Sequence, residues 1–180
     1  RALYAEYKAH RDAQPEDLSS QVPLVRELVA AYQIPMLEVT GCEADDVIAT
    51  LVAAAPSDMR VSILSTDKDL MQLVSERVAV IDTMKGRRYG PAEVEERFGV
   101  PPARVLDLRA LVGDPSDNIP GVKGIGEKGA AKLIAEYGTL ENLLEHAGEI
   151  PAARTRSALQ EQADAARLSK RLAALREDVA

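Results

Sequence analysis

Short apolar runs alternate with segments of helical periodicity in the first part of the chain. An apolar run at residues 36–39, followed by Gly41, predicts a strand and a turn, and helical spacing follows over residues 43–55. Residues 15–32 predict an earlier amphipathic helix, kinked at Pro23. Its apolar positions fall on roughly one face and comprise Leu18, Val22, Val25, Leu28 and Val29.

A second strand, turn and helix follow directly. Residues 61–64 are rich in β-branched side chains and predict a strand, residues 65–67 predict a turn, and residues 70–74 continue as a helix. Residues 78–82 predict a third strand. Strands that alternate with helices favour a twisted, mainly parallel sheet covered on both faces, because parallel neighbours need a crossover connection. Sites in such sheets form beyond the carboxyl ends of the strands.

The pattern changes after residues 85–88, which predict a hairpin turn. No strand signal follows, and Gly and Pro separate apolar-periodic segments. Helices are expected at residues 91–98, 102–112, 127–137, 139–146 and 152–176. We therefore expect an α/β fold with an α/β region over residues 1–112 and a helical region over residues 113–180.

Composition restricts the class of protein. The chain has 180 residues, and its 46% hydrophobic content excludes general disorder. Its single cysteine, Cys42, excludes a disulfide framework and a multi-cysteine zinc site, and indicates a reducing compartment such as the cytoplasm. No apolar run reaches the length of about 18 residues that spans a bilayer. The chain begins at Arg1 without a preceding strand, so we expect a piece of a longer protein.

Acidic residues cluster at three junctions between predicted elements. Converging carboxylates repel one another unless cations lie among them, and oxygen ligands without nearby His or Cys suit Mg²⁺ or Mn²⁺. Two such ions roughly 3.5 to 4 Å apart can activate water and stabilise the leaving oxygen of a phosphodiester, as in nucleases and phosphatases. The candidate ligands are Glu43, Asp45 and Asp46, then Asp67 and Asp69, then Asp114 and Asp117.

Each cluster alone also fits a structural role. Residues 43–46 suit a helix N-terminus, residues 67–69 suit a cap with a solvated neighbour, and residues 114–118 suit an Asx turn before Pro120. The first two junctions are predicted at the same edge of the sheet, where their carboxylates would converge. Coincidence at three linked junctions is less plausible than one shared site, which favours the metal-site interpretation.

A glycine-rich hairpin at residues 121–126 leads into the helix predicted at 127–137. Its glycines allow positive φ and close approach of the backbone to a ligand, and a helix N-terminus favours an anion. The hairpin is therefore a candidate contact for the phosphates of a nucleic acid, read without base recognition. A tight corner between helices is the alternative. The residues proposed to bind are Gly121, Lys123, Gly124, Gly126, Lys128 and Lys132.

Charge is unevenly distributed, although 22 Lys and Arg against 29 Asp and Glu give a net charge of −7. Residues 154–176 carry an excess of four positive charges, which predicts a basic strip for phosphates or an ordinary solvated helix face. Near the front, Tyr7, Lys8 and Arg11 combine an aromatic ring with two cations, a plausible grip on a single strand or a scissile phosphate. A polar surface helix is the alternative there.

These motifs resemble the 5′-nuclease, or flap endonuclease, family, in the order in which that family carries them. The resemblance covers nearly the whole chain and is strongest to the 5′–3′ exonuclease domains at the N-terminus of bacterial DNA polymerases. The segments that carry it are residues 7–11, 43–49, 66–69, 113–122 and 123–128.

The resemblance implies a twisted, mainly parallel sheet and a helical lobe with a helix–three-turn–helix motif, similar to a helix-hairpin-helix. It also implies a monomeric, Mg²⁺-dependent enzyme of the bacterial cytoplasm, associated with the nucleoid, that cleaves 5′ flaps and 5′ ends of DNA in primer removal, nick translation and repair. The seven carboxylates match the family's metal ligands, residues 121–126 match a hairpin that grips duplex DNA and in relatives holds K⁺, and Lys8 and Arg11 match catalytic cations. A polymerase domain in the same full-length chain is a further expectation.

The chain also departs from the family pattern. Family members begin with a strand that bears a metal-binding Asp and carry a second Asp before the arch, and neither segment stands in this sequence. A non-catalytic, structure-specific DNA-binding fragment is therefore an alternative. A phosphatase that uses Asp67 and Asp69 is a weaker alternative, because Met71 occupies a position where that motif carries Thr or Val.

Overall fold

The sheet is small and mixed. The computed structural model describes residues 4–11 and 13–179, and this part of the chain contains three strands. β1 (Val61–Leu64) pairs in parallel with β2 (Val78–Asp82), and β2 pairs antiparallel with β3 (Arg87–Tyr89). The α/β class is confirmed, but the sheet is not mainly parallel, because it has one parallel and one antiparallel pairing.

Two sequence predictions about strands are wrong. Residues 36–39 form no strand, because no strand of the described residues pairs with this run, and Met36 and Leu37 are each more than half exposed. The predicted hairpin turn at residues 85–88 lies two residues earlier, so that Arg87 already belongs to β3. Tyr89, the last residue of β3, is buried, so the strand contributes a side chain to the core although Arg87 and Arg88 are exposed.

Most predicted helices are present within two residues of the expected bounds. The α-helices are α1 (Glu16–Ala31), α2 (Ala44–Ala54), α3 (Pro91–Phe98), α4 (Val105–Val112), α5 (Glu127–Tyr137), α6 (Leu140–Glu145), α7 (Ala153–Glu161) and α8 (Ala163–Ala173). Three short 3₁₀ helices join them, namely η1 (Asp69–Leu73), η2 (Pro102–Arg104) and η3 (Ala147–Glu149). The helix predicted at residues 70–74 is therefore a 3₁₀ turn.

The single long helix predicted at residues 152–176 is wrong, because Gln162 separates α7 from α8. Gln162 leaves the helical conformation with φ of −119°. Its side-chain oxygen accepts a hydrogen bond from the Lys123 amide at 2.9 Å, and its side-chain nitrogen donates to the Lys123 carbonyl at 3.3 Å. The break between α7 and α8 thus allows the Gln162 side chain to bind the backbone of the glycine hairpin.

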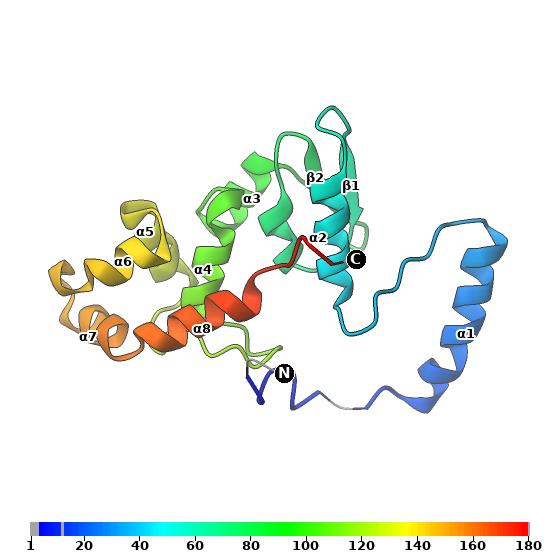
Figure 1. Ribbon diagram of the computed structural model, residues 1–180. Helices are drawn as coiled ribbons and strands as arrows, with labels where there is room; N and C mark the ends of the chain where they lie inside the picture. The colour runs from blue at the N-terminus through cyan, green and yellow to red at the C-terminus, as the bar shows by residue number, and fades with distance from the viewer. Residues whose placement is uncertain (1–3, 12, 180) are drawn as a thin grey trace.

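α1 stands apart from the rest of the described chain and is joined to it by extended segments (Figure 1). None of its residues is buried, and Leu18, Val25 and Leu28 are each more than half exposed. The apolar periodicity correctly predicted the helix. Its apolar stripe is left largely uncovered, since the rest of the described chain buries none of its residues.

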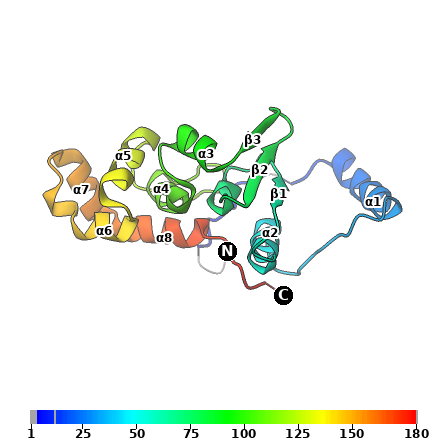
Figure 2. The same cartoon turned by 90° about the horizontal axis from the view of Figure 1, so that it is seen from above.

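One hydrophobic core runs through both predicted regions. It extends from Val80 of the sheet, through Leu108 and Leu111 of α4, to Ile134 and Leu159 of the helical region. α4 packs against α8, α5, α6 and η1, so it lies between the sheet end and the α5–α7 end of the molecule (Figure 2). The acidic loop that follows α4 is therefore anchored to a rigid, buried helix.

No helix in the part of the chain that the structure describes is long and apolar enough to cross a membrane.

Candidate metal and nucleic-acid site

The first acidic junction is the start of α2. Glu43 precedes the helix in an extended conformation, while Asp45 and Asp46 lie in its first turn, where the helix dipole favours negative charge. Asp46 Oδ1 accepts a hydrogen bond from the Arg176 amide at 2.9 Å. The C-terminal segment thereby returns from α8 to the start of α2.

The second junction follows β1. Asp67 Oδ1 accepts a hydrogen bond from the Asp69 amide at 2.9 Å, and the Asp67 amide donates to Ser65 Oγ at 3.0 Å. These bonds form the turn that places Asp69 at the start of η1. Asp67 is exposed, whereas the Asp69 side chain is only 16% exposed.

The third junction is the loop after α4. Asp114 and Ile119 exchange two backbone hydrogen bonds of 2.9 and 2.8 Å, which closes the intervening residues into a tight loop. Asp114 and Asp117 are both buried, although Asp117 retains 12% of its side-chain exposure. Asn118 has φ of 59°, a left-handed conformation that Asn tolerates better than most residues.

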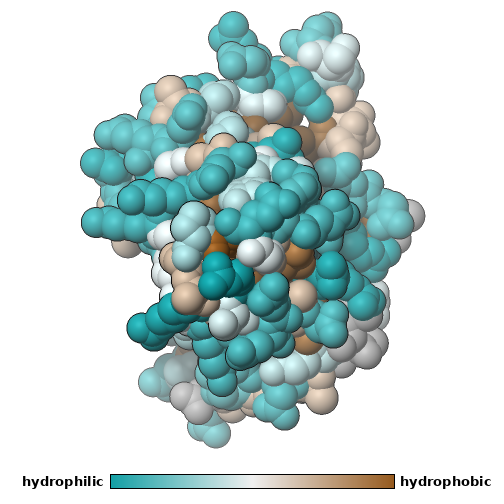
Figure 3. Space-filling view, turned by 90° about the vertical axis from the view of Figure 1, so that its left-hand side faces the viewer, coloured by the Kyte–Doolittle hydropathy of each residue, from teal (hydrophilic) through white to brown (hydrophobic). Residues whose placement is uncertain are grey.

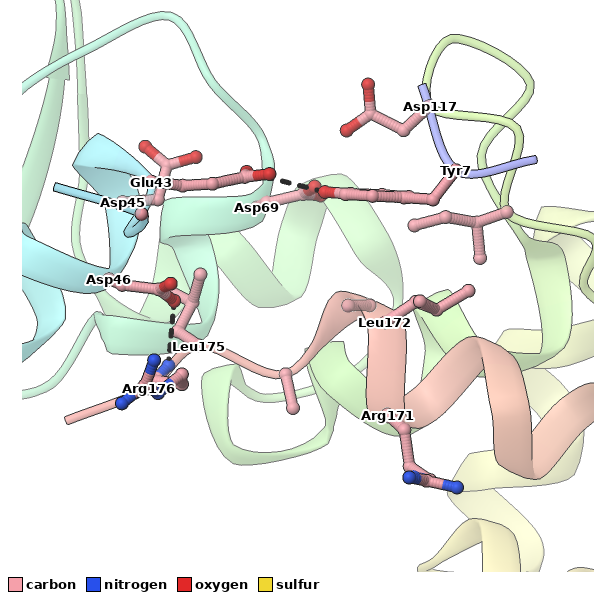
Figure 4. Close-up of a pocket in the computed structure, with 14 residues that line it drawn as sticks. Tyr7, Glu43, Asp45, Asp46, Asp69, Asp117, Arg171, Leu172, Leu175 and Arg176 are labelled. Carbon is pink, nitrogen blue, oxygen red and sulfur yellow. Dashed lines mark hydrogen bonds between the residues drawn. The ribbon is translucent and has the colours of Figure 1, made fainter. Parts of the chain in front are cut away.

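These junctions meet at one pocket, as predicted. The carboxylates at the start of α2 and of η1 lie across this pocket from Asp117 of the third junction and from Tyr7 of the N-terminal segment (Figure 4). Its acidic lining comprises Glu43, Asp45, Asp46, Asp69 and Asp117. Asp67 and Asp114 were expected there as well, but neither lines this pocket.

The carboxylates are not drawn tightly together. Among the described residues, no three acidic, His or Cys side chains lie close enough to hold one metal ion. Protein cations lie between them instead. The ligand role of all seven acids therefore stays a prediction.

The N-terminal segment supplies those cations. Lys8 Nζ bonds to Glu43 and lies 3.6 Å from Asp117 Oδ2, while Arg11 bonds to Asp117 Oδ1. The Tyr7 hydroxyl lies 3.4 Å from Glu43 Oε2. The Lys8 amide also donates to the Asp117 carbonyl at 3.0 Å, so this segment is bound directly to the third junction. The predicted grip residues and the predicted metal ligands thus belong to one site.

The pKa values of Lys8 and of two pocket carboxylates, Asp45 and Asp69, are all raised, but for different reasons. Burial is the largest single influence and acts to lower the pKa of Lys8, but the hydrogen bonds and charge attraction of Glu43 and Tyr7 together raise this pKa well above the usual value. Burial, followed by repulsion from Asp67 and Glu43, raises the pKa of Asp45. Burial raises the pKa of Asp69 to about 6 despite the opposing effect of the Arg109 charge. Five carboxylates and two arginines line the pocket, so its carboxylates would attract a further cation.

The glycine hairpin contacts α8 and the residue that precedes this helix. Gly121 has φ of 62° and packs directly against the backbone of residues 112–113. Its amide donates to Ser169 Oγ at 2.9 Å, so this amide and that of Lys123 are engaged within the protein. Gly124 and Gly126 are exposed, and neither has a close neighbour at the position of a Cβ. Gly121 is therefore a packing residue, while the other two glycines leave the hairpin accessible.

Exposed lysines flank that hairpin. Lys123, Lys128 and Lys132 are all exposed, and none forms an ion pair within the described residues. Gly126 is the N-cap of α5, so the free amides of that helix open on the same side. The end of the molecule formed by α5, α6 and α7 is largely hydrophilic (Figure 3).

The basic strip predicted for residues 154–176 is partly neutralised. Lys170 Nζ lies 2.7 Å from Asp107 Oδ1, and Arg167 lies 3.3 Å from Glu141. Arg176 pairs with Asp178 at 3.2 Å. Of these pairs, only Lys170 with the buried Asp107 joins two helices through a buried group, and the exposed arginines can also serve as phosphate contacts.

Arg109 was not predicted as a site residue, and Arg171 and Arg176 were predicted only as part of the basic strip. Arg176 lines the pocket from the C-terminal segment, while Arg171 lines it and turns its guanidinium away (Figure 4). Arg109 is 6% exposed and contacts Asp69 and Asp114. An arginine inside the apolar sequence of α4 was the available signal for Arg109, whereas nothing in the sequence indicated that the C-terminal segment returns to α2.

Comparison with known families gives the class. Residues 1–99 match a family described as "5'-3' exonuclease, N-terminal resolvase-like domain", and residues 100–180 match "5'-3' exonuclease, C-terminal SAM fold". Together these matches cover the entire chain. The chain belongs to the 5′–3′ exonuclease family.

Its relatives include bacterial polymerases. The chain is 48% identical over 178 residues to DNA polymerase I of Rhizobium leguminosarum and 46% identical over 180 residues to that of Bacillus caldotenax. These alignments cover 98% and 97% of this chain but only 18% and 20% of the relatives. The chain thus spans about a fifth of the length of the curated relatives it matches.

Solved structures support the fold. A T5 D15 protein co-crystallised with metal ions has a TM-score of 0.80 and 24% identity, covering 96% of this chain and 68% of that chain. The catalytic core of Rad2 in complex with DNA substrate has a TM-score of 0.61 and 19% identity, covering 100% of this chain and 61% of that chain. At these identities the similarity establishes a shared fold.

Proposed function

We propose that this chain is the 5′-nuclease portion of a longer polymerase and acts as a structure-specific 5′–3′ exonuclease and flap endonuclease. It would hydrolyse phosphodiester bonds at 5′ ends and 5′ flaps of DNA, in primer removal, nick translation and repair. The observation that carries this proposal is the convergence of five acidic residues from three junctions on one pocket, in a chain that belongs to the 5′–3′ exonuclease family.

The pocket suits a hard divalent cation. Its acidic side chains come from all three junctions and offer carboxylate oxygens, which Mg²⁺ and Mn²⁺ prefer. We assign Glu43, Asp45, Asp69 and Asp117 as the principal ligands. Bound there, Mg²⁺ would supply an activated water and stabilise the departing 3′ oxygen.

Lys8 and Arg11 would act on the phosphate. The raised pKa of Lys8 keeps this side chain protonated at neutral pH, so it serves as a fixed positive charge rather than as a general base. Both cations bond to carboxylates that border the pocket, and they would exchange these partners for the scissile phosphate. Tyr7, whose pKa is raised mainly by burial, stays neutral and offers a ring and a hydroxyl beside them.

DNA would extend from the pocket to the hairpin. Backbone amides at Gly124 and Gly126, the N-terminus of α5 and three exposed lysines support a contact with duplex phosphates that does not read the bases. We propose that the helical region, residues 113–180, contains a helix–three-turn–helix motif and that K⁺ binds at residues 121–126, as the family resemblance implies. The duplex would follow this motif while a single strand passes the N-terminal segment.

A DNA-binding module without catalysis is the second candidate. It is favoured by one observation, that no three acidic side chains among the described residues surround a common point closely enough for a metal ion. The hairpin and its lysines would then carry the whole function. Binding and cleavage therefore have to be measured on the same substrate.

The decisive comparison is between the parent and Asp117→Asn, in the 180-residue chain and in the full-length gene product. A 5′-labelled flap DNA with Mg²⁺ is scored for cleavage, and the same DNA with Ca²⁺ is scored for binding. We expect Asp117→Asn to abolish cleavage while binding stays within about threefold, since that carboxylate faces the pocket and not the hairpin. Cleavage at the parental rate would refute the metal assignment. Tight binding without cleavage by both parental proteins would establish the binding module.

A further inference from the structure

Arg109 is a buried charge within an apolar helix. It is 6% exposed, and its neighbours Leu108, Ala110 and Leu111 form part of the hydrophobic core. Removing an arginine from water is costly unless carboxylates and hydrogen bonds replace the solvent. The position of this side chain therefore requires a specific set of partners.

Those partners come from two different acidic junctions. Arg109 Nη2 lies 2.7 Å from Asp69 Oδ1 and also donates a hydrogen bond to Asp114 Oδ2. Arg109 Nη1 lies 3.5 Å from the Gly113 carbonyl oxygen. One guanidinium thus links the start of η1 to the loop after α4, which are separated in sequence by more than forty residues.

Asp114 is bonded to protein donors through both of its oxygens. Oδ1 accepts hydrogen bonds from the Ser116 amide at 2.9 Å and the Ser116 hydroxyl at 2.6 Å. Oδ2 accepts from Arg109 and lies 3.1 Å from Lys68 Nζ. Burial opposes ionisation, but the hydrogen bonds from Ser116 and Arg109 hold the pKa of Asp114 well below its usual range. Asp114 is therefore an ionised brace inside its loop.

The same loop carries Asp117 to the pocket. The Asp117 amide donates to the Asp114 carbonyl at 3.2 Å, so the position of Asp117 depends directly on that of Asp114. On the other side of Arg109, Asp69 lines the pocket itself. The two pocket carboxylates reached through Arg109 stand on opposite sides of the site (Figure 4).

We propose that Arg109 is a positioning residue of the nuclease site, whose guanidinium ties Asp69 to the Asp114 brace and so sets the distance between Asp69 and Asp117. The effect on metal binding rests on the proposed function, whereas the link between the two junctions rests on the contacts of Arg109 alone. The guanidinium also supplies a permanent positive charge between two acids, so they remain together before a metal binds. Lysine, as a single point charge, would retain the charge and lose part of the geometry.

The link between the junctions can be measured without metal. Hydrogen exchange is followed at the amides of Asp114, Ser116 and Ile119, whose hydrogen bonds close the loop. We expect Arg109→Met to accelerate this exchange at least tenfold and Arg109→Lys to restore part of the protection. Arg77→Met is the matched control, because Arg77 is partly buried and bonds to the Val52 carbonyl, away from the loop.

The consequence for the site is measured by titration with Mn²⁺ alone. We expect the affinity of Arg109→Met to fall by about 10- to 100-fold, the range typical for residues that orient metal ligands, while Arg77→Met binds as the parent does. Partial recovery in Arg109→Lys supports a role through charge and geometry together. Equal affinity and equal loop exchange in Arg109→Met and the parent would overturn the proposal.

The two readouts separate this proposal from the proposed function. If the parent binds no Mn²⁺, the metal site is refuted, whereas the exchange data still decide whether Arg109 joins the junctions. If Arg109→Met fails to fold, Asp114→Asn tests the same link from the other side with a side chain of the same shape. Unchanged exchange of the loop in Asp114→Asn would then overturn the proposal.

Discussion

Replacement of Gly121 by alanine tests whether the glycine hairpin is built for packing or for ligand approach. Gly121 has φ of 62°, and a Cβ at this position would lie 2.6 Å from the Gly113 amide nitrogen and from the Val112 carbonyl carbon. Both neighbours are backbone atoms, so they cannot rotate away. The left-handed conformation costs roughly 1 to 2 kcal/mol for alanine, and forced repacking adds about 1 to 3 kcal/mol.

We therefore expect Gly121→Ala to lose roughly 2 to 5 kcal/mol of unfolding free energy. For a chain of this size that corresponds to a fall in Tm of roughly 4 to 20 °C. Urea and thermal unfolding followed by circular dichroism measure both quantities. Gly126→Ala is the matched control, because φ at Gly126 is −89° and nothing lies within 4 Å of the point that an added Cβ would occupy.

The control should differ in both stability and binding. We expect Gly126→Ala to stay within about 1 kcal/mol of the parent, since alanine is only a weaker N-cap than glycine. Its added methyl group stands where we propose that DNA phosphates approach, so duplex affinity should fall severalfold. Equal stability of Gly121→Ala and the parent, or an equal loss in both variants, would refute this division of roles.

Three further predictions concern charge, pH and packing. Lys8→Met should lower the single-turnover cleavage rate of a 5′ flap by about 100-fold or more, as expected for loss of a fixed charge at the reacting phosphate, and an unchanged rate would contradict the role of Lys8. Because Asp69 has a pKa of about 6 and protonation competes with metal, the Mn²⁺ affinity of the parent should fall about fourfold between pH 7.5 and 5.5 through this group. An affinity that stays constant over this range would contradict the raised pKa of Asp69. Leu111→Ala, at a fully buried position of α4, should cost about 2 to 5 kcal/mol in urea unfolding, and a cost below about 1 kcal/mol would contradict the central position of α4.

The convergence of the acidic clusters was predicted by an argument that is only partly correct. The expected strand at residues 36–39 is absent, so Glu43 and Asp45 do not follow a strand at the edge of the sheet. They reach the pocket because α2 packs against η1, which follows β1. A pattern of polar residues at element junctions thus located the site, while the packing that brings the junctions together could not be obtained from local periodicity.

Helix prediction succeeded where the sequence carries its own start and stop signals. Pro91 and Gly99 bound α3, and Gly126 and Gly138 bound α5, in both cases at the predicted residues. The break at Gln162 has no such signal, because it depends on a contact with the hairpin made across the fold. The same limitation applies to Arg109, whose sequence position indicated an unusual buried charge but not its partners.

The most direct test of the account is the Mg²⁺ dependence of flap cleavage by the full-length gene product. A 5′-labelled flap DNA is incubated over a range of Mg²⁺ concentrations with the parent, with Asp45→Asn and with Asp107→Asn, a buried acid that pairs with Lys170 away from the pocket. We predict saturable, chelator-sensitive cleavage by the parent and by Asp107→Asn, and none by Asp45→Asn. Cleavage that persists without a divalent cation, or equal rates for Asp45→Asn and the parent, would contradict the assignment of this pocket as the nuclease site.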